Sequence, residues 1–105
     1  MGIQSRLPKN NDPDVRGTLA VKSTPVELLP EESGRLGFFL CNNGNSDLYW
    51  STMPGVSDGS VAGSLGGGLI SSGGDYLSSS QLDGYTGPIW AVCPSGSTVV
   101  FVMSW

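Results

Sequence analysis

The side chains that could carry out chemistry in this chain are few. Its 105 residues contain no histidine, so neither a Ser-His-Asp nor a Cys-His relay can be assembled. Cys41 and Cys93 are the only thiols; both lie among apolar neighbours, and Cys41 lacks nearby cations that would favour the thiolate. We interpret them as two buried small side chains or as a disulfide between strands. Two cysteines alone supply too few ligands for a zinc site, and we expect no metal or other cofactor.

The acidic side chains beyond residue 35 occur where the chain is expected to turn. Asp58 and Asp83 each precede a glycine, Asp75 follows two glycines, and Asp47 follows another turn. These positions are typical of turn residues, and they lack the dense D-x-D-x-D-G alternation of a calcium loop. A pair of carboxylates that hydrolyses glycosidic bonds is therefore disfavoured. The sequence predicts a protein that is not an enzyme.

Charge is distributed unevenly along the chain. All five lysines and arginines lie within the first 35 residues, while the whole chain has a net charge of −4. An acidic body without cations would repel the phosphates of nucleic acid, so we expect no nucleic-acid partner. We find neither an apolar run long enough to cross a membrane nor the apolar core of a secretion signal, and we expect no membrane partner. The function classes that remain act by contact with proteins or glycans.

Residues 1–17 have the composition of an extended arm. Prolines, amide side chains and charges dominate this segment, and the cations Arg6, Lys9 and Arg16 alternate with Asp12 and Asp14. This mixture of charges favours docking on a neighbouring subunit. The alternative is a frayed terminus without a function.

The rest of the chain, residues 18–105, has the pattern of short strands joined by turns. Apolar runs rich in Val, Ile, Phe, Tyr and Trp are bounded by Gly, Asn, Asp, Ser or Pro, and no window shows helical spacing. The expected strands cover residues 18–23, 26–29, 35–42, 47–51, 69–70, 75–79, 87–93 and 97–105. We therefore predict one all-β domain, a small β-sandwich or jelly roll of about seven to eight antiparallel strands.

The turns suggest how some of these strands are connected. Residues 42–45 (NNGN) are typical of a hairpin, and residues 94–96 (PSG) are expected to close a last hairpin between strands 87–93 and 97–105. Residues 52–68 are so rich in glycine that we expect a mobile loop, or a loop held by a neighbour.

The last hairpin carries apolar residues on both faces. Val99, Phe101 and Met103 alternate with Val100 and Val102, although antiparallel strands usually have one polar face. We expect another copy of the chain to cover one face, in a trimer by preference or in a dimer; the alternative is that both faces are buried within one protomer. The residues assigned to this oligomer interface are Val100, Val102, Trp105 and Trp90.

Aromatic side chains offer a second binding hypothesis. Tyr49, Trp50 and Tyr85 could form a platform on which a sugar ring stacks, and Trp90 could join them. The alternative is that these side chains only pack in the core or in an interface. Tyr and Trp are common in both settings, so their presence does not decide between the two.

Two motifs resemble a known group of proteins. Arg35 opens a strand that runs into Asn42-Asn43-Gly44 and then Tyr49-Trp50, and a later stretch reads YTGPIWA over residues 85–91. Residues 18–105 resemble small virion proteins of tailed bacteriophages in these features. The resemblance implies a capsid decoration or cement protein in the virion, assembled in the host cytoplasm and bound to the major capsid protein or another virion protein. It is also compatible with the attachment domain of a head or tail fibre, or with a glycan-binding module.

Overall fold

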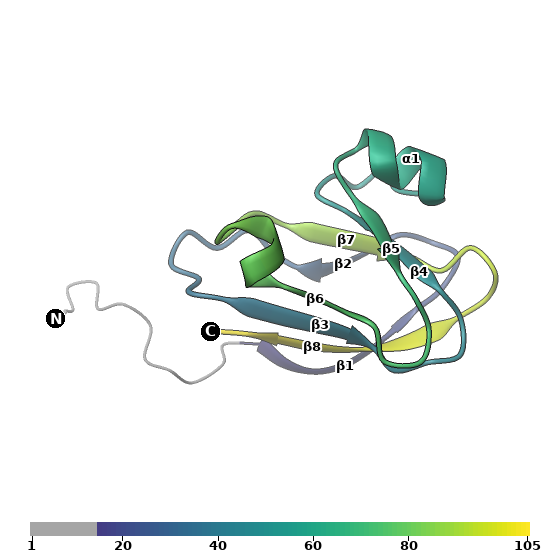
Figure 1. Cartoon of the computed structure of the whole chain (residues 1–105), viewed down its shortest axis with the longest axis horizontal. Helices are drawn as coiled ribbons and strands as arrows, with labels where there is room; N and C mark the ends of the chain where they lie inside the picture. Colours follow the sequence, from purple (N-terminus) through teal and green to yellow (C-terminus); the bar gives the residue numbers. More distant parts are fainter. Residues whose placement is uncertain (1–14) are drawn as a thin grey trace, which may run out of the picture.

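The computed structural model describes residues 15–105, and most of its regular elements are strands (Figure 1). Its elements are β1 (Val15–Val21), β2 (Val26–Leu29), β3 (Phe38–Asn42), β4 (Leu48–Ser51), a short helix α1 (Gly59–Ser64), β5 (Gly68–Ile70), β6 (Tyr76–Ser78), a 3-10 turn (Ser79–Leu82), β7 (Ile89–Val92) and β8 (Thr98–Ser104). The predicted all-β class is confirmed. β1 begins at Val15, before the expected Thr18, and Arg16 lies within it opposite Met103 of β8. Arg6 and Lys9 lie outside the described residues.

The strands form two four-stranded antiparallel sheets packed face to face. Sheet A has the order β1-β8-β3-β6 and sheet B the order β2-β7-β4-β5. β1 pairs with β8, β2 with β7, β3 with β6 and β4 with β5, as if one long hairpin had been rolled up. The β3–β8 and β4–β7 pairings then complete the two sheets. This is the strand order of a jelly roll, a fold in which two sheets share one core.

Neither of the two expected hairpins forms. β3 and β4 flank the turn at 42–45 but belong to different sheets, and the turn at 94–96 likewise carries the chain from β7 in sheet B to β8 in sheet A. The turn residues were located correctly, whereas the partners of the strands were wrong. The reason is that each of these strands has an apolar face to bury. When the chain crosses to the opposite sheet, the apolar face of one strand packs against the apolar face of the next across the core.

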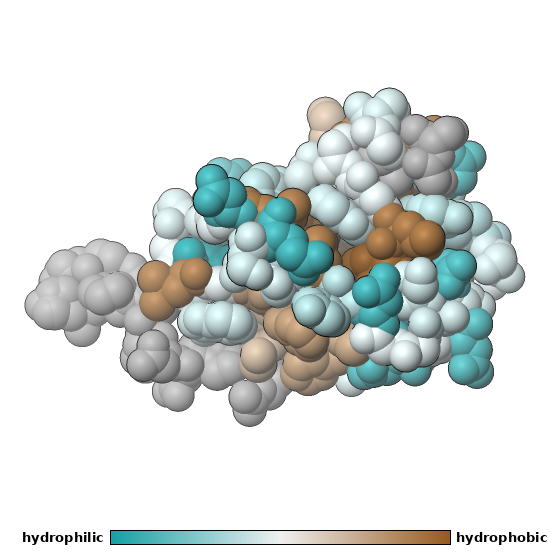
Figure 2. Space-filling view, in the orientation of Figure 1, coloured by the Kyte–Doolittle hydropathy of each residue, from teal (hydrophilic) through white to brown (hydrophobic). Residues whose placement is uncertain are grey.

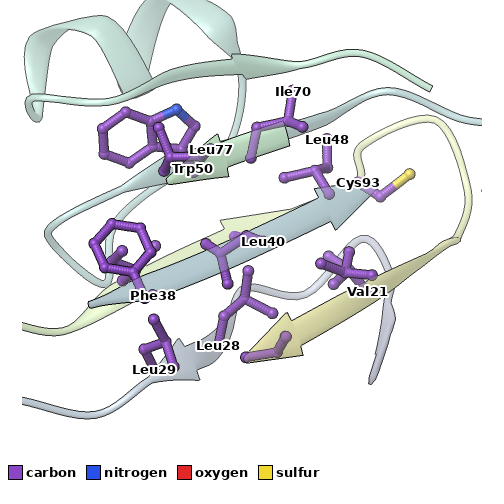
Figure 3. Packing of buried hydrophobic residues seen from close by; sticks show 14 residues of the cluster. Val21, Leu28, Leu29, Phe38, Leu40, Leu48, Trp50, Ile70, Leu77 and Cys93 are labelled. Atoms are coloured by element: carbon purple, nitrogen blue, oxygen red, sulfur yellow. The ribbon is translucent and has the colours of Figure 1, made fainter. Parts of the chain in front are cut away.

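The core lies between the sheets and is filled by alternate residues of each strand (Figure 3). In sheet A, Phe38 and Leu40 of β3 and Val100 and Val102 of β8 are at most 1% exposed. Sheet B contributes a matching set from β4, β5 and β7: Leu48, Trp50, Ile70, Ile89 and Ala91. Burying a large aliphatic or aromatic side chain stabilises a fold by roughly 1.5–3 kcal/mol, so this shared layer is the main source of stability.

The glycine-rich segment between β4 and β5 covers the outer side of sheet B. In Figure 1, α1 stands beyond sheet B, on the side away from sheet A. Val56 is completely buried against Val92 of β7, with Tyr49 and Trp90 packed around the pair. The side-chain oxygens of Ser51 and Thr52 both donate to the carbonyl of Leu65 at 3.2 Å. The expectation of a mobile loop is therefore corrected, because the segment docks on its own sheet.

Candidate contact surface on sheet A

The outer side of sheet A carries apolar and aromatic side chains. In β3, Phe39 and Cys41 are half-buried and alternate with the buried residues that face the core. The register places Phe39 opposite Met103, and Cys41 opposite both Phe101 and Tyr76. We call this surface the sheet A face and define it by the outward residues Phe39, Cys41, Tyr76, Ser78, Val99, Phe101 and Met103. Figure 2 shows apolar surface over β3 and β8 in the lower middle of the view.

Three aromatic rings from three strands form the centre of the sheet A face. The ring of Phe39 stacks on that of Tyr76, with centroids 5.5 Å apart and planes inclined by 28°. The ring of Phe101 approaches Phe39 from the other side at 6.5 Å and 57°. Such ring pairs hold one another in place, so this cluster is a preformed apolar patch.

The sheet A face is partly exposed, and the seven positions that define it carry no charge. Tyr76 is 52% and Val99 43% exposed, values high for large side chains on a sheet. The chain as a whole has a net charge of −4. The outward positions of the edge strand β1 add one charged residue to this side of the sheet, Arg16, which lies opposite Met103. An uncharged aromatic patch on an acidic protein is the composition expected of a surface that contacts another protein.

The residues expected to form the oligomer interface occupy different places. Val100 and Val102 lie in the protomer's own core, so their side chains cannot reach a second chain. This corrects the assignment of faces on the last strand: the outward residues are Val99, Phe101 and Met103. Apolar residues occupy both faces of β8, and for this reason alternation alone did not show which face is inward.

Trp105 borders the sheet A face, whereas Trp90 lies on sheet B. The backbone N–H of Trp105 donates to the carbonyl of Gly37 at 3.0 Å, which continues the pairing of β8 with β3. A Cβ on Gly37 would lie 2.7 Å from the ring of Trp105, so the glycine leaves room for the indole. Trp90 lies on the outer side of sheet B, where it packs against Val56 and Val92, so it is not part of the sheet A face.

The aromatic residues proposed for sugar stacking do not share a surface. Tyr49 lies on the outer side of sheet B, while its neighbour Trp50 points into the core and is 8% exposed. Tyr85 lies before β7, where its hydroxyl donates to the carbonyl of Pro88 at 2.8 Å. A stacking platform needs rings on one open face, and these three do not provide it.

The two cysteines are separate thiols in this fold. Cys93 is completely buried, as expected for a small apolar side chain. Cys41 is half-exposed on the sheet A face, where its thiol donates to Oδ1 of Asn43 at 3.1 Å. The expectation of burial is thus confirmed for Cys93 and wrong for Cys41.

Arg35 and Tyr85, both part of the resemblance motifs, form a polar cluster at one end of the sandwich. The Arg35 guanidinium is buried and donates to the carbonyls of Gly87, at 3.0 Å, Tyr85 and Pro30. Burial lowers the pKa of Arg35 from its usual value, an effect that Glu32 partly opposes. Because it binds carbonyls that follow β2 and precede β7, Arg35 fastens two connections to each other. Its role is in folding.

The pKa of Tyr85 provides a test of this cluster. Burial raises the pKa of its phenol above the usual value of about 10, an effect that Arg35 partly opposes. Since the folded pKa lies above the unfolded one, the phenol contributes stability that is complete below about pH 10 and is lost as the pH rises through the folded pKa. We expect ultraviolet absorbance to show a phenolate that forms above the usual range and is absent in Tyr85→Phe. A titration unchanged by Tyr85→Phe would contradict this.

Residues 15–105 were also compared with the requirements of a metal site and of a membrane-spanning helix, and they meet neither. Within this range, no group of three or more His, Cys, Asp or Glu side chains is arranged to hold a metal ion. None of the helices in the described part is long and apolar enough to span a membrane. Comparisons with protein families, with curated proteins and with solved structures found no match.

Proposed function

We propose that this protein is a non-enzymatic structural component of a bacteriophage virion, a decoration or cement protein of the capsid. It acts by contact with other proteins, among them the major capsid protein or another virion protein. The observation that carries the proposal is the sheet A face, where Phe39, Tyr76 and Phe101 form a partly exposed cluster of uncharged rings. The resemblance of residues 18–105 to small virion proteins supplies the setting, assembly in the host cytoplasm.

The fold is compatible with this role. Jelly rolls occur in viral capsid proteins and also in lectins, so the fold alone favours neither attachment to a shell nor binding of glycans. The separation of Tyr49, Trp50 and Tyr85 weakens the glycan hypothesis. Tyr49 and Trp90 do lie together on sheet B, but both are partly buried against Val56 and Val92. Protein contact is the stronger of the two proposals for this reason.

The cations of residues 1–17 are proposed as the second contact. A virion presents many equivalent sites, so several weak contacts per copy, or several copies joined together, give firm attachment through a high effective concentration. Opposite charges on the two partners accelerate docking and fix its orientation. In this proposal Arg6 and Lys9 bind acidic groups on the shell, and Arg16 at the start of β1 contributes to the same contact.

The attachment can be tested with charge reversals at matched positions. Particles from which the protein has been stripped should rebind it, and Arg6→Glu combined with Lys9→Glu should weaken rebinding more than tenfold, with the largest loss at low salt. The control is Lys22→Glu, a reversal at an exposed position of the body. Rebinding that is unaffected by the double reversal would refute the role of the arm. A protein absent from purified particles would refute the virion role itself.

A further inference from the structure

We propose that the sheet A face binds the same face of a second copy, so that the protein forms an isologous dimer with its two sandwiches stacked. The inference rests on the proposed function only in taking this face to be covered by protein. It goes further in naming the partner, the residues and the symmetry.

The first argument is that sheet A alone offers an open apolar face. The outer side of sheet B is occupied by the segment that carries Val56 and α1, which buries Val92. Sheet A has no such cover among residues 15–105, and Tyr76 and Val99 remain exposed there. Two open faces would let copies stack without limit, whereas one open face allows a single closed contact.

The second argument concerns symmetry. A dimer with twofold symmetry brings the same patch of both chains together, so a single patch is sufficient. A ring of three copies needs two different patches that match each other. The described residues present one apolar face, and this favours a dimer over the trimer expected from the sequence.

The third argument is electrostatic. Each copy has a net charge of −4, so two copies repel each other over most of their surfaces. At the sheet A face, the seven defining residues bring no charge into the contact. The only charged residue at an outward position of the described strands of this sheet is Arg16, opposite Met103 on the edge strand β1. The centres of two such faces can therefore approach without burying an unpaired charge, which would be costly, and the charge at Arg16 lies at the rim of the contact.

The fourth argument is the size of the face, which also sets the expected affinity. β1 and β8 have seven residues each, β3 has five and β6 three. At about 3.4 Å per residue and about 4.8 Å between strands, sheet A has a footprint of about 360 Å² per copy. Both copies together would cover about 720 Å², less than the roughly 1,000 Å² of a stable specific interface and in the range of weak, transient contacts. The rings of Phe39, Tyr76 and Phe101 lie near its middle, where anchor residues contribute most. A weak, concentration-dependent dimer follows.

Sedimentation velocity of the full chain over a range of concentrations tests the proposal. We expect the wild-type protein to pass from monomer to dimer, and Phe101→Glu and Tyr76→Glu each to weaken association more than tenfold. The matched control is Leu69→Glu: Leu69 lies on β5 of sheet B, is 48% exposed, and should tolerate the change without loss of the dimer. Near-ultraviolet circular dichroism checks that each variant is folded. If one of the two substitutions on the face prevents folding, the other still tests the proposal.

Three results would overturn the proposal. One is a chain that remains monomeric at every concentration, and another is a dimer that survives both substitutions on the face. The third is a monomer whose rebinding to particles is abolished by Phe101→Glu, which would assign the face to a shell protein and leave the virion role intact. A protein that is absent from virions but dimerises through the sheet A face would refute the virion role and support the dimer.

Discussion

Replacement of Asn42 by leucine is expected to lower the free energy of unfolding by about 3 kcal/mol or more. Asn42 is completely buried at the end of β3, yet its amide is fully paired. Its Nδ2 donates to the carbonyls of Ser46 and Ile70, each at 2.9 Å. Its Oδ1 accepts from the Thr98 hydroxyl at 2.6 Å and from the Gly44 N–H at 3.2 Å.

The size of this effect follows from what the leucine leaves behind. Leucine has a similar volume but no polar atoms, so two carbonyls, a hydroxyl and an N–H lose a partner at a site that joins sheet A to β5 of sheet B. Each buried polar group left without a partner costs about 1–3 kcal/mol. Urea unfolding measures the loss, and Asn45→Ala, at an exposed position of the same turn, should change stability by less than about 0.5 kcal/mol. Equal effects of the two substitutions would contradict the account of this network.

The same substitution, glycine to alanine, is expected to have opposite effects at two positions of the segment between β4 and β5. At Gly67 a Cβ would lie 1.8 Å from the carbonyl oxygen of Trp50 and 2.8 Å from Cα of Ser51. These are backbone atoms of β4, which is held on both sides by β5 and β7 and cannot easily move. We expect Gly67→Ala to cost at least about 2 kcal/mol, which lowers Tm by about 8 °C or more.

Gly63 is the matched control for this prediction. It lies in α1, and a Cβ there would meet nothing within 4 Å. Alanine favours helix over glycine by about 0.5–1 kcal/mol, so Gly63→Ala should raise Tm by a few degrees. Thermal unfolding followed by circular dichroism compares the two variants. A Gly67→Ala variant as stable as wild type would show that the segment does not lie against β4.

The positions of the strands could be predicted from the sequence, but their pairing could not. All eight expected strands exist, because short apolar runs between turn residues mark a strand wherever it pairs. β8 pairs with β1 and β3, which are distant along the chain, and local sequence contains no signal for such contacts. Likewise, apolar residues on both sides of β8 gave no indication that Val100 faces the core and Phe101 faces outward.

The candidate surface was only partly predictable for the same reason. An apolar outer face on the last strand was expected and exists. It is formed by Val99, Phe101 and Met103, however, and not by Val100 and Val102. The cluster of Phe39, Tyr76 and Phe101 draws one residue from each of three strands, so no single motif could reveal it. The burial of Val56 was also missed. Its glycine-rich surroundings indicate a loop whose ordering costs much conformational entropy, and such a loop is not expected to dock on the sheet.

The motif residues that suggested a phage protein have structural roles in this fold. Arg35 binds the carbonyls of Tyr85 and Gly87 at one end of β3, and Asn42 binds Thr98 at the other end. Both side chains tie connections between strands to the body of the sandwich. They therefore account for how the chain folds, while the proposed contacts lie on the sheet A face and in residues 1–17.

Alkylation of Cys41 by a bulky maleimide is the most direct measurement of whether the sheet A face is covered by a second copy. Cys41 lies opposite Phe101 and Tyr76 on that face, and Cys93 is completely buried, so the rate reports on one thiol. We predict that the rate constant falls as the protein concentration rises, and that in Phe101→Glu it stays high throughout. A wild-type rate constant that is the same at every concentration would contradict the account.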